Sequence, residues 1–210
     1  MINIFRTISS IIYMQYKKLH YFFYEKPKGL DFSLTDKQVE SENKNAHYYS
    51  CTDPLTLRKI KNYITKRIKP CDCSFLDIGC GKGVILDYFS SMGFNKLDGL
   101  ECCKKYCNIA ERNLQINKRK NVNIICNDAI MFEKYERYNV YFMYNPFSES
   151  VLKEVVSKIE NAHKHSHTCA YLIYVFPIFH NVIVSNSSFV LIDKMFSPLT
   201  MKWTNVYFLR

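Results

Sequence analysis

The 210-residue chain is long enough to bury one sizeable core, and its 48% hydrophobic and 23% charged residues are ordinary globular values that argue against a disordered or fibrous protein. The formal net charge of +10 is uneven, because residues 1–70 hold 13 Lys and Arg against 6 Asp and Glu. This basic third indicates either an anionic partner or a coding bias, and both remain open. Nine cysteines, an odd number without a secretory signal, favour free thiols in a reducing, cytoplasmic compartment.

Residues 2–24 are expected to form an apolar helix, in which Ile4, Ile8, Ile11 and Ile12 share one face. Charged residues interrupt the apolar run, so it is too short to span a bilayer, which needs about 20 apolar residues. Three roles are open for it: an extra helix packed on the domain, a helix lying on a membrane surface, or an interface with a partner.

The polar stretch 25–47 is predicted to be a linker or a mobile loop, because it combines Pro and Gly with several Asn and Glu residues. A helix follows it. Thr52 or Asp53 is placed to cap its first turn, and the helix ends before Pro70.

From Ser74 onward the chain alternates between expected strands and helices. The strands are expected at 74–78, 96–101, 122–126, 138–144, 169–176, 189–196 and 203–209, and the helices at 82–92, 103–117, 148–164 and 178–185. Strand–helix alternation predicts an α/β fold with a Rossmann-like, doubly wound, mostly parallel sheet. The last two strands leave no room for a crossover helix, so they predict a C-terminal antiparallel hairpin.

The most informative motif joins the first strand to its helix and reads Phe-Leu-Asp-Ile-Gly-Cys-Gly-Lys-Gly over residues 75–83. Glycines in this G-x-G-x-G pattern let a ligand approach the main chain closely. Glu101 ends the next strand, where a carboxylate is placed to accept hydrogen bonds from ribose hydroxyls. Asp77 stands just before the glycines and would repel a pyrophosphate, whereas it suits a cationic amino group. S-adenosylmethionine therefore fits this turn better than NAD.

The segment from Phe75 to Asn117 resembles the first half of a class I S-adenosylmethionine-dependent methyltransferase. The resemblance extends over about residues 46–210, and residues 1–45 would then be an N-terminal helical extension and linker. In that family the glycine loop holds the amino-acid part of the cofactor, and later strand ends hold the ribose and the adenine. The cofactor-binding residues that the resemblance implies are Asp77, Gly79, Cys80, Gly81, Gly83, Glu101, Cys102, Asp128, Ala129, Asn145 and Pro146.

Asn145-Pro146-Phe147, at the end of the fourth strand, resembles the N-P-P-Y or N-P-P-F motif of amino methyltransferases. In those enzymes the Asn binds the target amino group and the aromatic ring stacks on it. The second proline is missing here, and the same ending is found in small bacterial methyltransferases of unassigned substrate. Asn145 is therefore the candidate for the acceptor pocket, with the acceptor left open. Further candidates for substrate contact or a lid are Tyr48, Tyr49, Phe147 and His180.

No metal site is expected, because the cysteine spacings differ from the usual C-x-x-C pair. His163, His165 and His167 alternate near the amino edge of the sheet, opposite the expected pocket, and are predicted to lie in a solvated turn.

The resemblance implies a methyltransferase acting on an O or N acceptor. A small molecule or glycan precursor is favoured, because no RNA-binding module is visible and the core is nearly neutral. One alternative is an amino methyltransferase that acts on nucleic acid or protein. Another is a non-catalytic, cofactor-binding or membrane-associated scaffold. The expected location is the cytoplasm or the periphery of a membrane.

Overall fold

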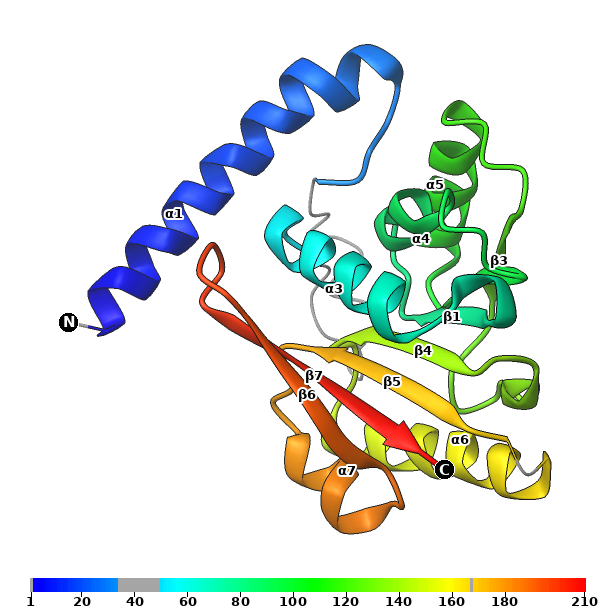
Figure 1. Ribbon diagram of the computed structural model, residues 1–210. Helices are drawn as coiled ribbons and strands as arrows, with labels where there is room; N and C mark the ends of the chain where they lie inside the picture. The colour runs from blue at the N-terminus through cyan, green and yellow to red at the C-terminus, as the bar shows by residue number, and fades with distance from the viewer. Residues whose placement is uncertain (1, 34–49, 167) are drawn as a thin grey trace.

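The computed structural model describes residues 2–33, 50–166 and 168–210, with side chains from residue 7 onward (Figure 1). Its centre is a seven-stranded sheet in the order β3-β2-β1-β4-β5-β7-β6. The strands are β1 (Ser74–Ile78), β2 (Lys96–Glu101), β3 (Val122–Cys126), β4 (Val140–Tyr144), β5 (Ala170–Val175), β6 (Val190–Ser197) and β7 (Lys202–Leu209). Strands β1 to β5 are parallel, and β7 is antiparallel to both of its neighbours, which confirms the expected sheet and terminal hairpin.

The helices fall close to their expected positions. They are α1 (Ile2–His20), α3 (Pro54–Arg67), α4 (Val84–Phe89), α5 (Lys104–Ile116), α6 (Glu149–Ser166) and α7 (His180–Asn186), with short turns η1 (Tyr21–Glu25), η2 (Lys26–Lys28), η3 (Pro70–Asp72) and η4 (Tyr135–Arg137). Helix α4 begins later than predicted. Gly81 and Gly83 before it have φ of +52° and +83°, and these positive values lie outside the range of a right-handed α-helix.

Helices cover both faces of the sheet, so the core has two apolar layers (Figure 1). Side chains along a strand point alternately to the two faces. In β4, Tyr141 and Met143 pack toward α6 and α7, whereas Val140 and Phe142 pack toward α3 and α4. This double burial explains why the parallel strands are almost continuously apolar.

Helix α1 lies beside this body and contacts it at few places (Figure 1). Residues 26–33, expected to be part of a linker or mobile loop, instead fold back in a compact turn. The cause is the fully buried carboxylate of Glu25, which accepts hydrogen bonds from the backbone N–H groups of Phe32 and Ser33 at 2.8 and 3.0 Å. No helix of the described residues is both long and apolar enough to cross a membrane.

Candidate functional site

The glycine loop leaves β1 at its carboxyl end and packs directly against the end of β4. The Gly79 N–H donates to the carbonyl oxygen of Leu100 at 2.8 Å, which ties the loop to β2. Gly79 has a φ of +75°, and a Cβ atom at this position would lie 2.7 Å from the Cβ atom of Pro146. Only glycine, which has no Cβ atom, fits so close to Pro146. Two segments that the sequence analysis singled out, 77–83 and 145–146, are therefore in contact.

Glu101, at the end of β2, is bound to the same loop. Its carboxylate is buried and accepts hydrogen bonds from the N–H groups of Gly81 and Cys103, both at 2.9 Å. Burial raises the pKa of this carboxyl group, and the two N–H groups act in the opposite direction. Glu101 therefore lies between the glycine loop and the first turn of α5. It ends β2, as the sequence predicted.

Asp77 is the most deeply buried acid of the loop, with 2% of its surface exposed. Among the described residues, no hydrogen-bond partner reaches its Oδ2 atom. Burial raises the pKa of Asp77 well above its usual value, and the negative charge of Glu101 raises it further. A cationic ligand group near this pair would stabilise both carboxylates in their charged forms.

The end of β3 adds a more exposed acid beside Glu101. The backbone N–H of Asn127 donates to the Glu101 carbonyl oxygen at 3.0 Å, which fixes the two strand ends together. The exposed Asp128 uses Oδ1 to accept from the N–H of Ile130 at 2.7 Å. Ala129 is buried in the apolar layer, so of these two residues only Asp128 offers a side chain to a ligand.

Asn145 is held in place by a residue that the sequence motifs did not indicate. Its Oδ1 atom accepts a hydrogen bond from the hydroxyl of Tyr174 at 2.6 Å, and its φ of +38° turns the chain sharply after β4. Burial raises the pKa of Tyr174, so its hydroxyl remains a donor. Pro146 is half-buried against the glycine loop, whereas the half-buried Phe147 packs on the apolar layer under α6.

The two thiols of the site are poor nucleophiles. Cys80 is buried beneath the loop, and burial raises its pKa well above the usual value. Burial also raises the pKa of Cys102 to about 12, and its thiol donates to Glu101 at 3.6 Å. Both therefore stay protonated at neutral pH.

The candidate histidines are held by tyrosine hydroxyls. His180 is half-buried, with Nδ1 2.8 Å from the hydroxyl of Tyr207 and 3.4 Å from the amide of Asn205. His163 is buried, not solvated as predicted: its Nε2 lies 2.8 Å from the Tyr141 hydroxyl, and burial lowers its pKa. No group of three or more metal-ligating side chains gathers among the described residues. His167, Tyr48 and Tyr49 lie outside the described residues.

A partly buried ion pair that the sequence did not indicate joins the N-terminal extension to the glycine loop. Lys82 is buried, and its Nζ lies 2.7 Å from Oδ1 of Asp31. The side chain of Asn113 accepts from the Asp31 N–H at 3.0 Å and donates to the Lys82 carbonyl at 3.1 Å. No local pattern could reveal this contact, because 51 positions separate Lys82 from Asp31.

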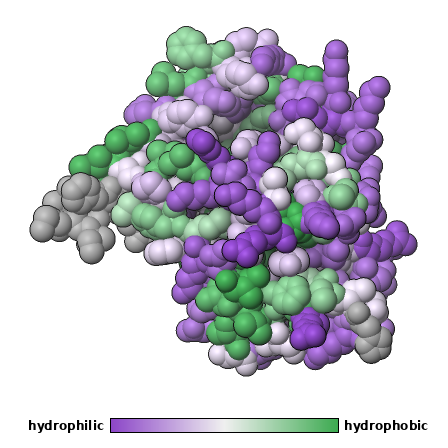
Figure 2. Space-filling view, in the orientation of Figure 1, coloured by the Kyte–Doolittle hydropathy of each residue, from purple (hydrophilic) through white to green (hydrophobic). Residues whose placement is uncertain are grey.

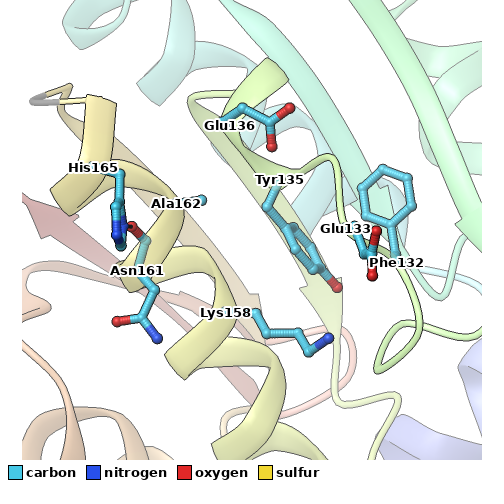
Figure 3. Close-up of a pocket in the computed structure, with 8 residues that line it drawn as sticks. All are labelled: Phe132, Glu133, Tyr135, Glu136, Lys158, Asn161, Ala162 and His165. Atoms are coloured by element: carbon cyan, nitrogen blue, oxygen red, sulfur yellow. Dashed lines mark hydrogen bonds between the residues drawn. The ribbon is translucent and has the colours of Figure 1, made fainter.

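A separate hollow of about 360 Å³ lies near the amino ends of the strands, away from the carboxyl ends where the glycine loop lies (Figure 3). It is bounded by the stretch before β4 and by the last turns of α6, and it is lined by Phe132, Glu133, Tyr135, Glu136, Lys158, Asn161, Ala162 and His165. Since η4 precedes β4, this hollow faces the amino end of the strand. It contains none of the residues that the sequence predicted for the site.

Together, the strand order, the terminal hairpin and the glycine loop after β1 give this chain the fold of the class I S-adenosylmethionine-dependent methyltransferases. No family model and no curated protein matches the sequence. Solved structures match the fold at low sequence identity.

Magnesium protoporphyrin IX methyltransferase (ChlM) from Synechocystis PCC 6803, with bound S-adenosylmethionine, is 12% identical with a TM-score of 0.59, and the match covers 73% of this chain and 77% of that one. The putative methyltransferase yhhF from Escherichia coli is 16% identical with a TM-score of 0.58, covering 74% and 86%. A mutant of MtNAS in complex with S-adenosylmethionine is 14% identical with a TM-score of 0.60, covering 74% of this chain and 62% of that one.

Proposed function

We propose that this chain is an S-adenosylmethionine-dependent methyltransferase with its catalytic domain in residues 46–210. The observation that carries the proposal is the direct contact of three strand ends around one glycine loop. Gly81 donates to Glu101, and Gly79 leaves no room for a side chain against Pro146. In open α/β sheets, ligands bind at this carboxyl edge.

The residues of the loop fit the chemical groups of this cofactor. Asp77 and Glu101 are two buried acids beside this loop, and burial raises the pKa of both, which suits an ammonium or sulfonium group. Glu101 accepts hydrogen bonds from two N–H groups and from the Cys102 thiol, and a carboxylate has about four acceptor positions, so a ribose hydroxyl could add to it. The exposed Asp128 is the residue we assign to the adenine, together with Ala129 and Cys102.

When bound, this cofactor would supply a methyl group on a sulfonium, for transfer to an acceptor with the sulfur leaving as a thioether. The protein then has to align the donor and the acceptor and exclude water. Asn145 and Pro146 would border the transferred group, since Pro146 contacts the glycine loop. Asn145 is suited to positioning because the Tyr174 hydroxyl fixes its side-chain amide.

The acceptor we propose is an oxygen or nitrogen of a small molecule or glycan precursor. The rival is an amino group of a nucleic acid or protein, as the Asn145-Pro146-Phe147 sequence suggests. Two features weigh against this rival: the side-chain Oδ1 of Asn145 already accepts from Tyr174, and Phe147 packs on the apolar layer. A carbonyl oxygen can accept a second hydrogen bond, so a target amine keeps one place at Asn145.

Calorimetry with S-adenosylmethionine and S-adenosylhomocysteine tests the cofactor assignment. A Glu101→Gln variant should bind both about 10- to 100-fold more weakly, because it loses charge-assisted hydrogen bonds to the ribose. Glu160→Gln is the matched control, since Glu160 is also a buried glutamate but lies in α6. Absence of binding by the parent protein would instead support a scaffold, and equal binding by Glu101→Gln would remove the ribose assignment.

A radiolabelled methyl-transfer assay against fractionated cell extract tests the acceptor. We expect label in small metabolites or glycan precursors. Label in RNA or protein would support the rival, and RNA as acceptor should also show binding that weakens as salt is raised.

A further inference from the structure

Helix α1 has its apolar face turned away from the protein. Ile8, Ile11, Ile12 and Leu19 are each about half exposed, with Leu19 at 57%. A surface helix of a globular protein normally directs its apolar stripe toward the core. Here the apolar stripe faces outward, so packing against the core does not account for these apolar residues.

The inner face of α1 contacts the body through polar atoms. The hydroxyl of Ser9 donates to the carbonyl oxygens of Pro198 and Leu199, in the turn between β6 and β7. The Tyr13 hydroxyl donates to the carbonyl oxygen of Cys51 at 2.9 Å, just before α3. These hydrogen bonds fix which side of the helix faces outward.

The apolar surface continues past the end of α1 into an aromatic cluster. Phe22, Phe23 and Tyr24 are exposed, and Phe23 is 81% exposed. Two lysines flank this cluster: the Lys26 Nζ lies 5.5 Å from the centre of the Phe22 ring, and the Lys28 Nζ lies 3.6 Å from that of Tyr24. Figure 2 shows hydrophobic side chains along the outer edge of this part of the molecule.

The charge of this segment selects the kind of partner. Residues 2–28 contain five basic residues, Arg6, Lys17, Lys18, Lys26 and Lys28, and one acid, Glu25. Glu25 is fully buried and accepts from the backbone, so it adds little negative charge to the surface. Apolar and aromatic residues with lysines beside them match the headgroup region of an anionic bilayer, whereas the buried centres of protein interfaces are poor in lysine.

We propose that α1 and η1 form a membrane-docking surface that binds an anionic lipid bilayer, with the outward apolar face inserted at headgroup level. The bilayer would then lie on the far side of α1 from the turn between β6 and β7. The Asp31–Lys82 pair joins the same extension to the glycine loop. The proposal does not depend on the methyltransferase activity.

Vesicle co-sedimentation of the full chain tests this surface. We expect binding to vesicles of phosphatidylcholine with phosphatidylglycerol, weaker binding at high salt, and little binding to phosphatidylcholine alone. Ile12→Ser and Phe23→Ser should each lower the partition coefficient by about tenfold, because each removes a large apolar side chain from the inserted face. Val190→Ser is the matched control and should bind like the parent, since Val190 is 63% exposed on the edge strand β6.

Three results would overturn the proposal. They are no binding to the anionic vesicles, unchanged binding by both Ile12→Ser and Phe23→Ser, or a dimer in light scattering that Ile12→Ser dissociates. The last result would assign the surface to a second copy of the chain. Circular dichroism of each variant checks that the fold is retained.

Discussion

At the scale of single residues, Gly79 joins the glycine loop to the end of β4. Gly79→Ala should destabilise the fold and weaken cofactor binding, because the new Cβ atom would meet Pro146 at 2.7 Å. The left-handed φ of +75° should cost about 1–2 kcal/mol, and the clash should add about 1–3 kcal/mol. Urea unfolding measures the loss of stability, and calorimetry measures the binding.

Gly93→Ala separates these two effects. Gly93 has a similar φ of +78°, but a Cβ atom there would meet nothing within 4 Å. It should therefore show the conformational cost alone and leave binding unchanged. Equal destabilisation by the two substitutions would show that the approach of Gly79 to Pro146 is not as close as the structure indicates.

At the scale of elements, Asp53 connects α3 to the terminal hairpin. Its buried carboxylate caps α3 by accepting from the Thr56 N–H at 3.0 Å, and it accepts from the hydroxyls of Ser197 at 2.9 Å and Thr200 at 3.0 Å. Asp53→Ala should lower the free energy of unfolding by about 2–4 kcal/mol, since it removes the cap and leaves buried donors unpaired. Chemical denaturation measures this loss.

Thr200→Ala is the milder comparison for the same contact. It removes one of the hydrogen bonds to Asp53 and leaves the helix cap in place, so it should cost about 1 kcal/mol. If Thr200→Ala lowered the free energy of unfolding as much as Asp53→Ala does, the hydrogen bond to the hairpin turn, and not the helix cap, would be the stabilising contact of Asp53.

The elements themselves could be predicted because their signals are local. Apolar runs, glycines and the cap at Asp53 each act within a few positions, and all expected strands and helices from Asp53 onward are found. The contacts missed by the sequence join residues far apart, as in the Lys82–Asp31 pair and the His163–Tyr141 hydrogen bond. Periodicity likewise predicts the apolar face of α1, but the exposure of that face and the hydrogen bonds of Ser9 and Tyr13 to distant parts of the chain show that it is directed outward.

At the scale of the whole molecule, the glycine loop combines stabilising and destabilising features. The loop is fastened by the Gly81–Glu101 hydrogen bond and by the Lys82–Asp31 pair. The same loop buries Asp77, whose Oδ2 atom has no hydrogen-bond partner among the described residues. Such a buried acid lowers the stability of the ligand-free protein, and binding of a cationic ligand would offset this.

The pH dependence of stability should reveal this effect of Asp77. Its folded-state pKa is raised by burial and by Glu101, so the folded protein binds more protons than the unfolded chain above the usual value of 3.8. Stability is therefore lost as pH rises through this window. Asp77→Asn removes the titration, so its free energy of unfolding relative to the parent should increase steadily from pH 4 to neutral pH.

Glu160→Gln should show the opposite trend in the same urea titrations. Burial raises the pKa of Glu160, but hydrogen bonds led by that from the Ser188 side chain outweigh burial, and the pKa is lowered. The contribution of Glu160 is thus present at neutral pH and is lost as pH falls, so the cost of Glu160→Gln should shrink in acid. If the difference between Asp77→Asn and the parent did not change with pH, Asp77 would not carry a raised pKa, and the cationic-ligand argument would lose its support.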